Sequence, residues 1–396
     1  MVPAPGGGML FQMTEPGPDT AGGAEATSVG VAGPLAQHSL LALDPQSISQ
    51  RVAAVGMPAF RGRQIVEWLY QKRKTDFTQM TNLSAGDRAW LTENFRIYSG
   101  EQVRHLTATD GTEKLLVRWR DGGLTETVMI PCDDDDADDF GRTIVKHRRT
   151  ACLSTQVGCP VGCAFCASGL AGLKRNLAAD EIIEQALRLC QMLPAERRLT
   201  NVVFMGMGEP LANFDAAVAA IRVLMAPWAF NISARKITVS TVGLPPQIRK
   251  LADEGLPVTL AISLHAPNDA LRREIIPWAR GIGIDELVQA GKYYFDKTGR
   301  EVTLEYIMLD GVNTLPEHAR ELAAVSRRLR ANVNLIYYNE VPELNFRRPA
   351  GATMLAFQNI LRQLHVNAHV RKSRGREIAA ACGQLARQDR QMTEAT

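Results

Sequence analysis

The chain has 396 residues, of which 45% are hydrophobic and 22% charged, and its formal net charge is +3. This composition is typical of a globular protein with one large and one smaller domain, and it excludes binding to nucleic acid through net charge alone. No run approaches the ~18 apolar residues of a membrane span, and the seven cysteines suggest no even disulfide framework, so we expect a cytoplasmic protein without a membrane partner.

The first hundred residues divide into a tail and a helical domain. Residues 1–40 are rich in Gly, Pro and Ala and lack the basic start and apolar core of a signal peptide, so we expect a disordered tail. Apolar residues at helical spacing, such as Ile65 and Leu69, lie among Arg and Lys. They predict short amphipathic helices in a small domain over residues 41–100.

Residues 101–150 are expected to form a β-rich connector. The stretch "KLLVRWRDGGLTETVMIP" has a Gly pair between two β-rich runs, which predicts a hairpin. After Cys132, six of the seven residues from Asp133 to Asp139 are Asp. This run lacks the spacing of an EF-hand, so we interpret it as a solvated acidic loop.

From residue 151 the pattern changes to short β-branched runs that alternate with longer helical stretches. Six strand–helix units at this spacing predict an α/β fold with a parallel, partial (β/α)6 barrel over residues 151–385, followed by a short tail over 386–396. The expected strands are "ACLSTQV", "TNVVFMG", "RKITVST", "PVTLAISLH", "EVTLEYIML" and "NVNLIYYN", with a final short strand "VNAHVRK". The expected helices include 180–193, 213–226, 285–297 and 316–330.

Three cysteines follow the first of these strands at the spacing C-x3-C-x2-C: Cys159, Cys163 and Cys166. Loops at the carboxyl ends of barrel strands build active sites, and clustered thiols in a reducing compartment indicate metal or redox chemistry. A zinc site would need a fourth nearby ligand, and none lies close in the sequence. A [4Fe–4S] cluster held by three thiolates would leave one iron open for an exogenous ligand.

The cysteine motif resembles that of the radical S-adenosylmethionine (SAM) superfamily. In that superfamily the open iron binds SAM, and an electron from the cluster cleaves SAM to a 5′-deoxyadenosyl radical. "MGMGEP" resembles the family's glycine-rich segment, in which Gly208 permits close backbone approach and Glu209 faces the SAM amino group. The resemblance implies that further SAM contacts come from Ser240, Ser263, Leu264, His265 and Asn339 at the ends of strands.

Four longer segments resemble one family, the RlmN-type RNA adenine C2 methyltransferases: "GMPAFRGRQIVEWLY", "TETVMIP", "ACLSTQVGC" and "SRGREIAAACGQL". The resemblance covers about residues 45 to 385. It implies that Cys382 is methylated by one SAM, that a second SAM supplies the radical, and that RNA is transiently tethered to Cys382. It also implies that Cys152 resolves the tether by forming a disulfide and that Glu126 is the proton acceptor.

The same resemblance implies the substrates and partners. The family methylates an adenine in 23S rRNA, and many members also methylate the adenine 3′ to the tRNA anticodon. We expect a reducing electron donor such as flavodoxin, and a monomer. Three basic patches suit phosphate contacts: Arg61, Arg63, Lys72, Arg73 and Lys74; Lys146, Arg148 and Arg149; and Arg371, Lys372, Arg374 and Arg376.

Two alternatives stay open. A Cfr-type enzyme that methylates C8 of adenine shares the cysteine logic, although the complete N-terminal helical domain favours C2. An iron–sulfur RNA-binding regulator without enzymatic activity would not need Cys382, Cys152 or the "GEP" motif. The segment after Asn339, "NEVPELNFRRP", also departs from the family's short Asn-Pro turn, so the path of this loop is not expected to follow the family's.

Overall fold

The computed structural model describes residues 37–137 and 143–385. Most of the expected N-terminal tail, the C-terminal tail 386–396 and part of the acidic run lie outside these residues. No helix in the described ranges is long and apolar enough to cross a membrane.

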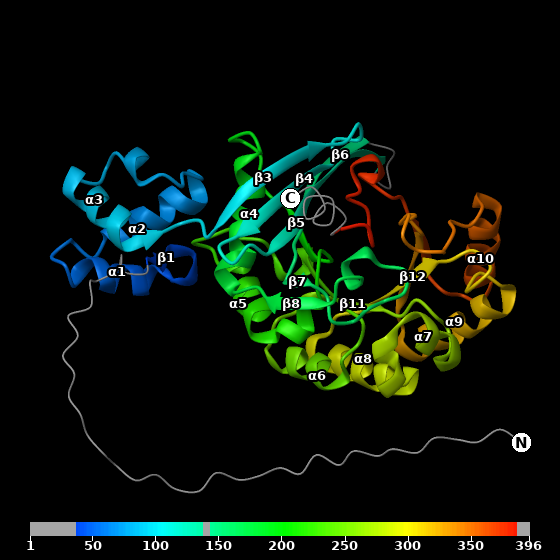
Figure 1. Cartoon of the computed structure of the whole chain (residues 1–396). Helices are drawn as coiled ribbons and strands as arrows, with labels where there is room; N and C mark the ends of the chain where they lie inside the picture. The colour runs from blue at the N-terminus through cyan, green and yellow to red at the C-terminus, as the bar shows by residue number, and fades with distance from the viewer. Residues whose placement is uncertain (1–36, 138–142, 386–396) are drawn as a thin grey trace, which may run out of the picture. The chain divides into compact units, whose positions relative to one another are not determined.

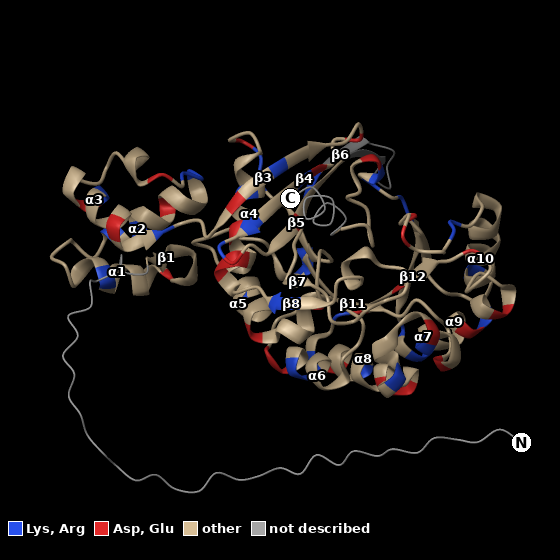
Figure 2. Cartoon of the chain, in the orientation of Figure 1, with Lys and Arg blue, Asp and Glu red and all other residues tan. Residues whose placement is uncertain are grey.

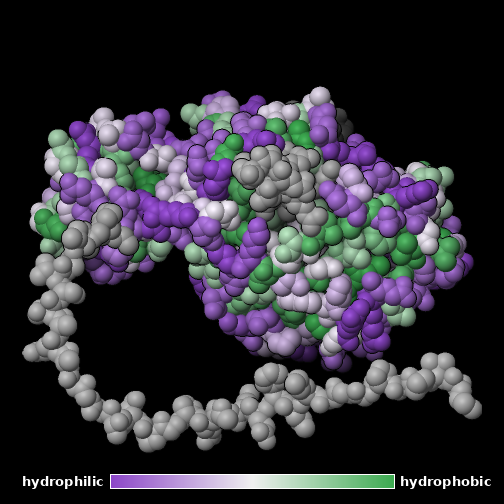
Figure 3. All heavy atoms as spheres, viewed as in Figure 1, coloured by the Kyte–Doolittle hydropathy of each residue, from purple (hydrophilic) through white to green (hydrophobic). Residues whose placement is uncertain are grey.

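The first described segment is helical, as expected. It contains β1 (His38–Ser39), α1 (Pro45–Ala53), α2 (Arg61–Val66) with a π-helical continuation over Glu67–Gln71, α3 (Ala85–Asn94) and β2 (Phe95–Arg96). Local capping explains where the helices begin: the Asp44 side chain accepts a hydrogen bond from the Ser47 N–H before α1, and Ser84 forms a capping box with Asp87 before α3. Hydrophilic residues cover most of this segment's visible face (Figure 3), with Val55 and Phe60 among its exposed apolar side chains.

One sheet of ten strands carries the rest of the described chain, in the order β14-β13-β12-β11-β10-β9-β6-β5-β4-β3. Its antiparallel part is β3 (Gly100–Thr107), β4 (Glu113–Trp119), β5 (Leu124–Ala137) and β6 (Thr143–Cys152). The expected hairpin is β4–β5. The last strand of this part, β6, pairs antiparallel with β5 on one side and parallel with β9 on the other, so it joins the two parts of the sheet.

The parallel part continues from β6 through six strand–helix units (Figure 1), which confirms the predicted α/β class. Its further strands are β9 (Asn201–Phe204), β10 (Ile237–Thr241), β11 (Thr259–Ser263), β12 (Val302–Met308), β13 (Asn332–Tyr337) and β14 (Ala368–Arg371). The helices that connect them are α4 (Ala179–Gln191), α5 (Phe214–Met225), α6 (Pro245–Asp253), α7 (Asp269–Ile275), α8 (Ile284–Thr298), α9 (Pro316–Leu329) and α10 (Gly351–Gln363). Along β9 and β10 buried residues alternate with partly exposed ones, so the two faces of these strands differ in their surroundings.

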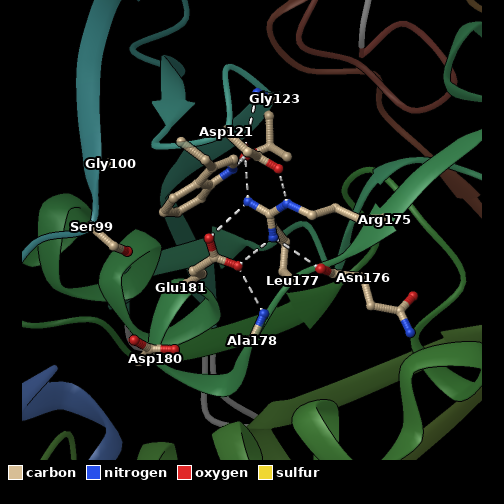
Figure 4. Close-up of polar contacts among 12 residues, drawn as sticks. Ser99, Gly100, Asp121, Gly123, Arg175, Asn176, Leu177, Ala178, Asp180 and Glu181 are labelled. Carbon is tan, nitrogen blue, oxygen red and sulfur yellow. Dashed lines mark hydrogen bonds and ion pairs between the residues drawn. The ribbon is translucent and has the colours of Figure 1, made fainter. Parts of the chain in front are cut away.

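The expected first barrel strand, residues 151–157, is divided in the structure. β6 ends at Cys152, and the chain then forms β7 (Gln156–Gly158), which pairs antiparallel with β8 (Leu173–Asn176). Arg175 on β8 holds this small sheet (Figure 4): its guanidinium bonds Glu181 at the start of α4 at 2.7 and 2.9 Å and also bonds Asp121 in the β4–β5 turn. The loop between β7 and β8 is therefore anchored at both ends, and this loop contains the three-cysteine motif.

Candidate active site

The three-cysteine loop is held by backbone hydrogen bonds to distant segments. The Cys159 N–H donates to Gly172 O at 3.1 Å, and the Ala164 N–H donates to Ile275 O at 2.9 Å. Gly158 has a φ of +79°, and a Cβ there would lie 2.0 Å from Gly172 O, so only glycine allows this close return of the chain. These contacts fix the direction in which the loop presents its thiols.

The thiols of Cys159, Cys163 and Cys166 are half-buried against an apolar cluster that includes Phe165 and Tyr338. Burial raises the pKa of the Cys159 thiol to about 12 and raises those of Cys163 and Cys166 as well. Burial alone therefore favours the protonated form of these thiols. A bound cation reverses this preference because it deprotonates a coordinating thiol.

A cavity of about 160 Å³ opens beside the three thiols, and we call it the thiol cavity. Most of the residues predicted to contact SAM line it, although they come from different strand ends: Gly208, Glu209, Ser240, Ser263 and His265. The fold therefore brings residues such as Cys159 and His265, more than a hundred positions apart in the sequence, to one cavity. Leu264 and Asn339 are not among the residues that line it; the Leu264 side chain lies in the main hydrophobic core.

The Glu209 carboxylate has two backbone partners. It accepts hydrogen bonds from the Leu211 N–H at 3.0 Å and the Val242 N–H at 2.7 Å, and burial raises its pKa to about 7. Gly208 before it has a φ of +105°, and a Cβ there would come within 2.7 Å of Gln156. This packing lets the glycine-rich segment lie directly against β7.

His265 has a defined protonation state. The Ile307 N–H points at its Nδ1 at 3.1 Å, so Nδ1 is the acceptor and the proton is on Nε2. Burial lowers the pKa of the imidazole to about 3, which keeps it neutral. Its backbone has a φ of +58°, and the buried Asn313 side chain donates to His265 O at 2.8 Å. His265 can therefore donate a hydrogen bond from Nε2, and Asn313, which sequence reasoning missed, holds it.

A second cavity of about 320 Å³, which we call the basic cavity, is lined by Arg148, Arg371, Lys372 and Arg374 together with Cys152 and Asn339. Cys382 lines both this cavity and the thiol cavity. Two hydrogen bonds to its backbone segment hold it there: the Asn339 side-chain amide donates from Nδ2 to Cys382 O at 3.3 Å, and the Ala167 backbone N–H donates to Gly383 O at 2.8 Å. The segment that carries Cys382 therefore connects the thiol cavity and the basic cavity.

Cys152 is buried at the end of β6 and packs with Val128 and Met207. Burial raises the pKa of its thiol to about 12, with a further contribution from the neighbouring Cys382. The disulfide predicted from the resemblance is not supported, because Cys152 and Cys382 are both free thiols. Both cysteines line the basic cavity, and each of them is a free thiol there.

Glu126 lies on β5 and lines neither cavity. Its carboxylate forms an ion pair with Lys114 at 2.8 Å, and both side chains are only 1% exposed. Lys114 Nζ also donates to Ala379 O at 3.1 Å, so the pair contacts the segment that carries Cys382. Glu126 is therefore a buried carboxylate, and its place beneath the C-terminal segment follows only from the tertiary fold.

The residues of the basic patches differ in their exposure and in their hydrogen-bond partners. Lys and Arg lie among Asp and Glu over the chain (Figure 2). Arg73 is engaged by the C-terminal end of α4, where it donates to Cys190 O, Leu193 O and Pro194 O at 3.1–3.2 Å, so it anchors the helical segment. Arg61 is held by Gln64 and by Asn82 O, whereas Arg63 is exposed.

Comparison with known proteins agrees with this arrangement. Residues 153–323 match the family model of the radical SAM superfamily, and residues 38–97 match that of the ribosomal RNA large subunit methyltransferase N-terminal domain. A relative from Rhodopirellula baltica, described as a probable dual-specificity RNA methyltransferase RlmN, is 47% identical over 332 residues, which cover 84% of this chain and 86% of the relative. A relative from Geobacillus kaustophilus with the same description is 41% identical over 353 residues, covering 89% of this chain and 93% of that one.

A solved structure is also similar. The crystal structure of a radical SAM methyltransferase from Sphaerobacter thermophilus superposes with a TM-score of 0.82 at 42% sequence identity. The match covers 88% of this chain and 99% of that chain.

Proposed function

Because this chain belongs to the RlmN family of radical SAM RNA methyltransferases, we propose that it methylates C2 of one adenine in 23S rRNA and of the adenine 3′ to the anticodon in tRNAs. The observation that carries the proposal is the position of Cys382, which lines both the thiol cavity and the basic cavity. A side chain at this junction can carry a carbon atom from a cofactor in one cavity to a base in the other.

The donor set of the thiol cavity fits an iron–sulfur cluster better than a single ion. Within residues 37–137 and 143–385, no three His, Cys, Asp or Glu side chains converge as a single metal ion requires. A [4Fe–4S] cluster does not need such convergence, since each thiolate binds a different iron. Cys159, Cys163 and Cys166 would hold it and leave the fourth iron open. When bound, the cluster and two SAM molecules per turnover supply the methyl group and the 5′-deoxyadenosyl radical.

The chain's own residues then have distinct roles. Gly208, Glu209, Ser240, Ser263 and His265 orient SAM, and His265 offers an Nε2–H donor to it. The SAM contacts of Leu264 and Asn339 stay predictions from the resemblance. We assign Asn339 a positioning role, because its amide holds the Cys382 backbone.

In the basic cavity, the adenine is presented to Cys382. Extrusion of the base from its stack is the general way in which enzymes reach an atom of a nucleobase. Arg148, Lys372 and Arg374 line the cavity and suit phosphate contacts. Cys382 carries the transferred carbon and tethers the RNA, and the resemblance assigns the release step to Cys152, which lines the same cavity. The resemblance assigns Glu126 as the acceptor of the C2 proton, and its ion-pair partner Lys114 contacts the segment that carries Cys382.

The N-terminal domain supports C2 over C8 as the target atom, because residues 38–97 match a domain named for the ribosomal RNA large subunit methyltransferases. The proposed partners are rRNA and tRNA and a reducing donor such as flavodoxin. The proposed state is a monomer in the cytoplasm, whose reducing conditions keep the cluster thiols free.

Two variants test the assignment. Cys382→Ala is expected to abolish RNA methylation but to retain SAM cleavage, because the thiol loop is unchanged. Cys152→Ala is expected to accumulate RNA bound covalently to Cys382, because release is blocked. Methyladenosine and 5′-deoxyadenosine are measured by mass spectrometry, and the adduct by denaturing gel. Cys190→Ala, a buried cysteine on α4 that lines neither cavity, is the matched control. Parental turnover by Cys152→Ala without an adduct would refute its role.

A further inference from the structure

One carboxylate in the thiol cavity has no assigned role. Glu305 lies in the middle of β12, is 3% exposed and lines the cavity. Asn334 on β13 donates to its Oε1 at 3.0 Å, whereas its Oε2 has no hydrogen-bond partner among the described residues. Arg371 also lines the cavity and its charge acts on the Glu305 carboxylate, but no ion pair joins the two in the described part of the chain, and Oε2 keeps no hydrogen-bond partner there. A buried carboxylate oxygen without a partner is costly, so the site calls for a ligand that donates to it.

Glu305 extends a row of polar side chains across neighbouring strands. Ser240 Oγ on β10 lies 3.2 Å from Ser263 Oγ on β11, and Ser263 is the register partner of Glu305 on β12. We call Ser240, Ser263, Glu305 and Asn334 the polar row. Its two serines are among the residues to which the proposed function assigns SAM, so a ligand bound to them lies beside Glu305.

The position of Glu305 separates it from the end of the cavity that contains Glu209. Glu209 follows β9 and accepts hydrogen bonds from two backbone N–H groups, whereas Glu305 comes from β12, and β10 and β11 lie between these two strands. The two carboxylates belong to different parts of the cavity wall. Glu305 therefore faces a part of the ligand other than its amino-acid end.

Two parts of SAM remain as donors, the ribose hydroxyls and the adenine amino group. The amino group stands next to a ring nitrogen that accepts, and this lone pair would face the second carboxylate oxygen unfavourably. A vicinal diol presents two donors side by side, and acidic side chains bind ribose hydroxyls in this way in dinucleotide-binding folds. We propose that Glu305 binds the ribose hydroxyls of SAM through its unpartnered Oε2, as an additional ligand-binding residue of the thiol cavity.

This inference rests on the proposed function, and the experiment separates the two. The anaerobically reconstituted holoenzyme is titrated with S-adenosylhomocysteine and with its 2′-deoxy and 3′-deoxy analogues, and Kd is measured by calorimetry. The parent is expected to bind at least one deoxy analogue roughly tenfold or more weakly, since a hydrogen bond to a charged group is lost. This comparison needs no variant, so it does not depend on whether a substituted protein folds.

Glu305→Gln is expected to bind S-adenosylhomocysteine roughly tenfold more weakly than the parent protein does. The variant should bind the deoxy analogues about as well as it binds S-adenosylhomocysteine itself. Glu301→Gln is the matched control: Glu301 also accepts from an Asn side chain of the next strand, Asn332 at 3.1 Å, but at the exposed end of these strands. It is expected to bind all three ligands as the parent does.

Three outcomes overturn the proposal. If Glu305→Gln discriminates against the deoxy analogues as strongly as the parent, another residue binds the ribose. If the parent does not discriminate, the ribose hydroxyls have no partner in the cavity. In both cases the proposed function stands, because S-adenosylhomocysteine still binds. If the parent binds no S-adenosylhomocysteine at all, the proposed function fails together with this inference.

Discussion

The buried ion pair between Lys114 and Glu126 allows a quantitative prediction. Lys114→Met keeps the length and apolar stem of the side chain but removes the ammonium that faces Glu126 at 2.8 Å. Both side chains are 1% exposed, so the carboxylate loses this ion pair in a place that water does not reach. Loss of one partner of a buried pair costs about 3–5 kcal/mol. We expect the free energy of unfolding of Lys114→Met to fall by about that amount.

The same strand offers a matched control. Arg118 on β4 pairs with Glu101 at 3.6 Å, but these side chains are 43% and 72% exposed. An exposed pair contributes about 0–1 kcal/mol, so Arg118→Met should change stability by no more than that. Urea unfolding followed by circular dichroism gives both values from the midpoints and slopes.

A double variant separates charge burial from simple loss of contacts. Lys114→Met combined with Glu126→Leu removes both charges, and replacing a buried pair by apolar residues of similar volume is often neutral. We therefore expect it to be more stable than Lys114→Met alone. If Lys114→Met costs as little as Arg118→Met, or if the double variant is less stable than the single one, the reasoning about the buried pair is refuted.

Three further predictions concern the cluster, RNA binding and the loop anchor. Anaerobically reconstituted protein should bind about four iron per chain; stoichiometric zinc without iron–sulfur absorbance would contradict the cluster assignment. Arg63→Ala should weaken RNA binding and reduce the slope of log K against log salt by roughly 0.7–0.9, whereas parental binding at every salt concentration would remove the exposed Arg63 from the interface. Arg175→Lys keeps the charge but not the paired bonds to Glu181 and Asp121, so the reconstituted variant should lose iron to a chelator faster than the parent. Lys250→Arg, which changes an exposed ion pair with Asp215, is the control. Equal rates of iron loss in the parent and both variants would show that the Arg175 anchor does not matter.

The sequence by itself determined the features that depend on near neighbours. The spacing of Cys159, Cys163 and Cys166 places three thiols in one loop whatever the rest of the chain does. The apolar, β-branched runs and the helical stretches between them predicted the parallel strands and the helices that cover them, because the alternation is written in local composition. The Gly pair at residues 122–123 likewise predicted the β4–β5 hairpin.

Other features were decided only by the tertiary structure, because they depend on which distant segments pack together. Arg63 and Arg73 look alike in a basic stretch, but only Arg73 meets the carbonyl groups at the end of α4. Glu126 and Glu305 each lie in a strand pattern that does not show what surrounds them in the fold. Burial beside Lys114 and inside the thiol cavity distinguishes them, and burial is set by the pairing of strands far apart in the chain. Cys382 lies at the junction of the two cavities for the same reason. Its segment packs against the three-cysteine loop, which is more than two hundred residues earlier in the chain.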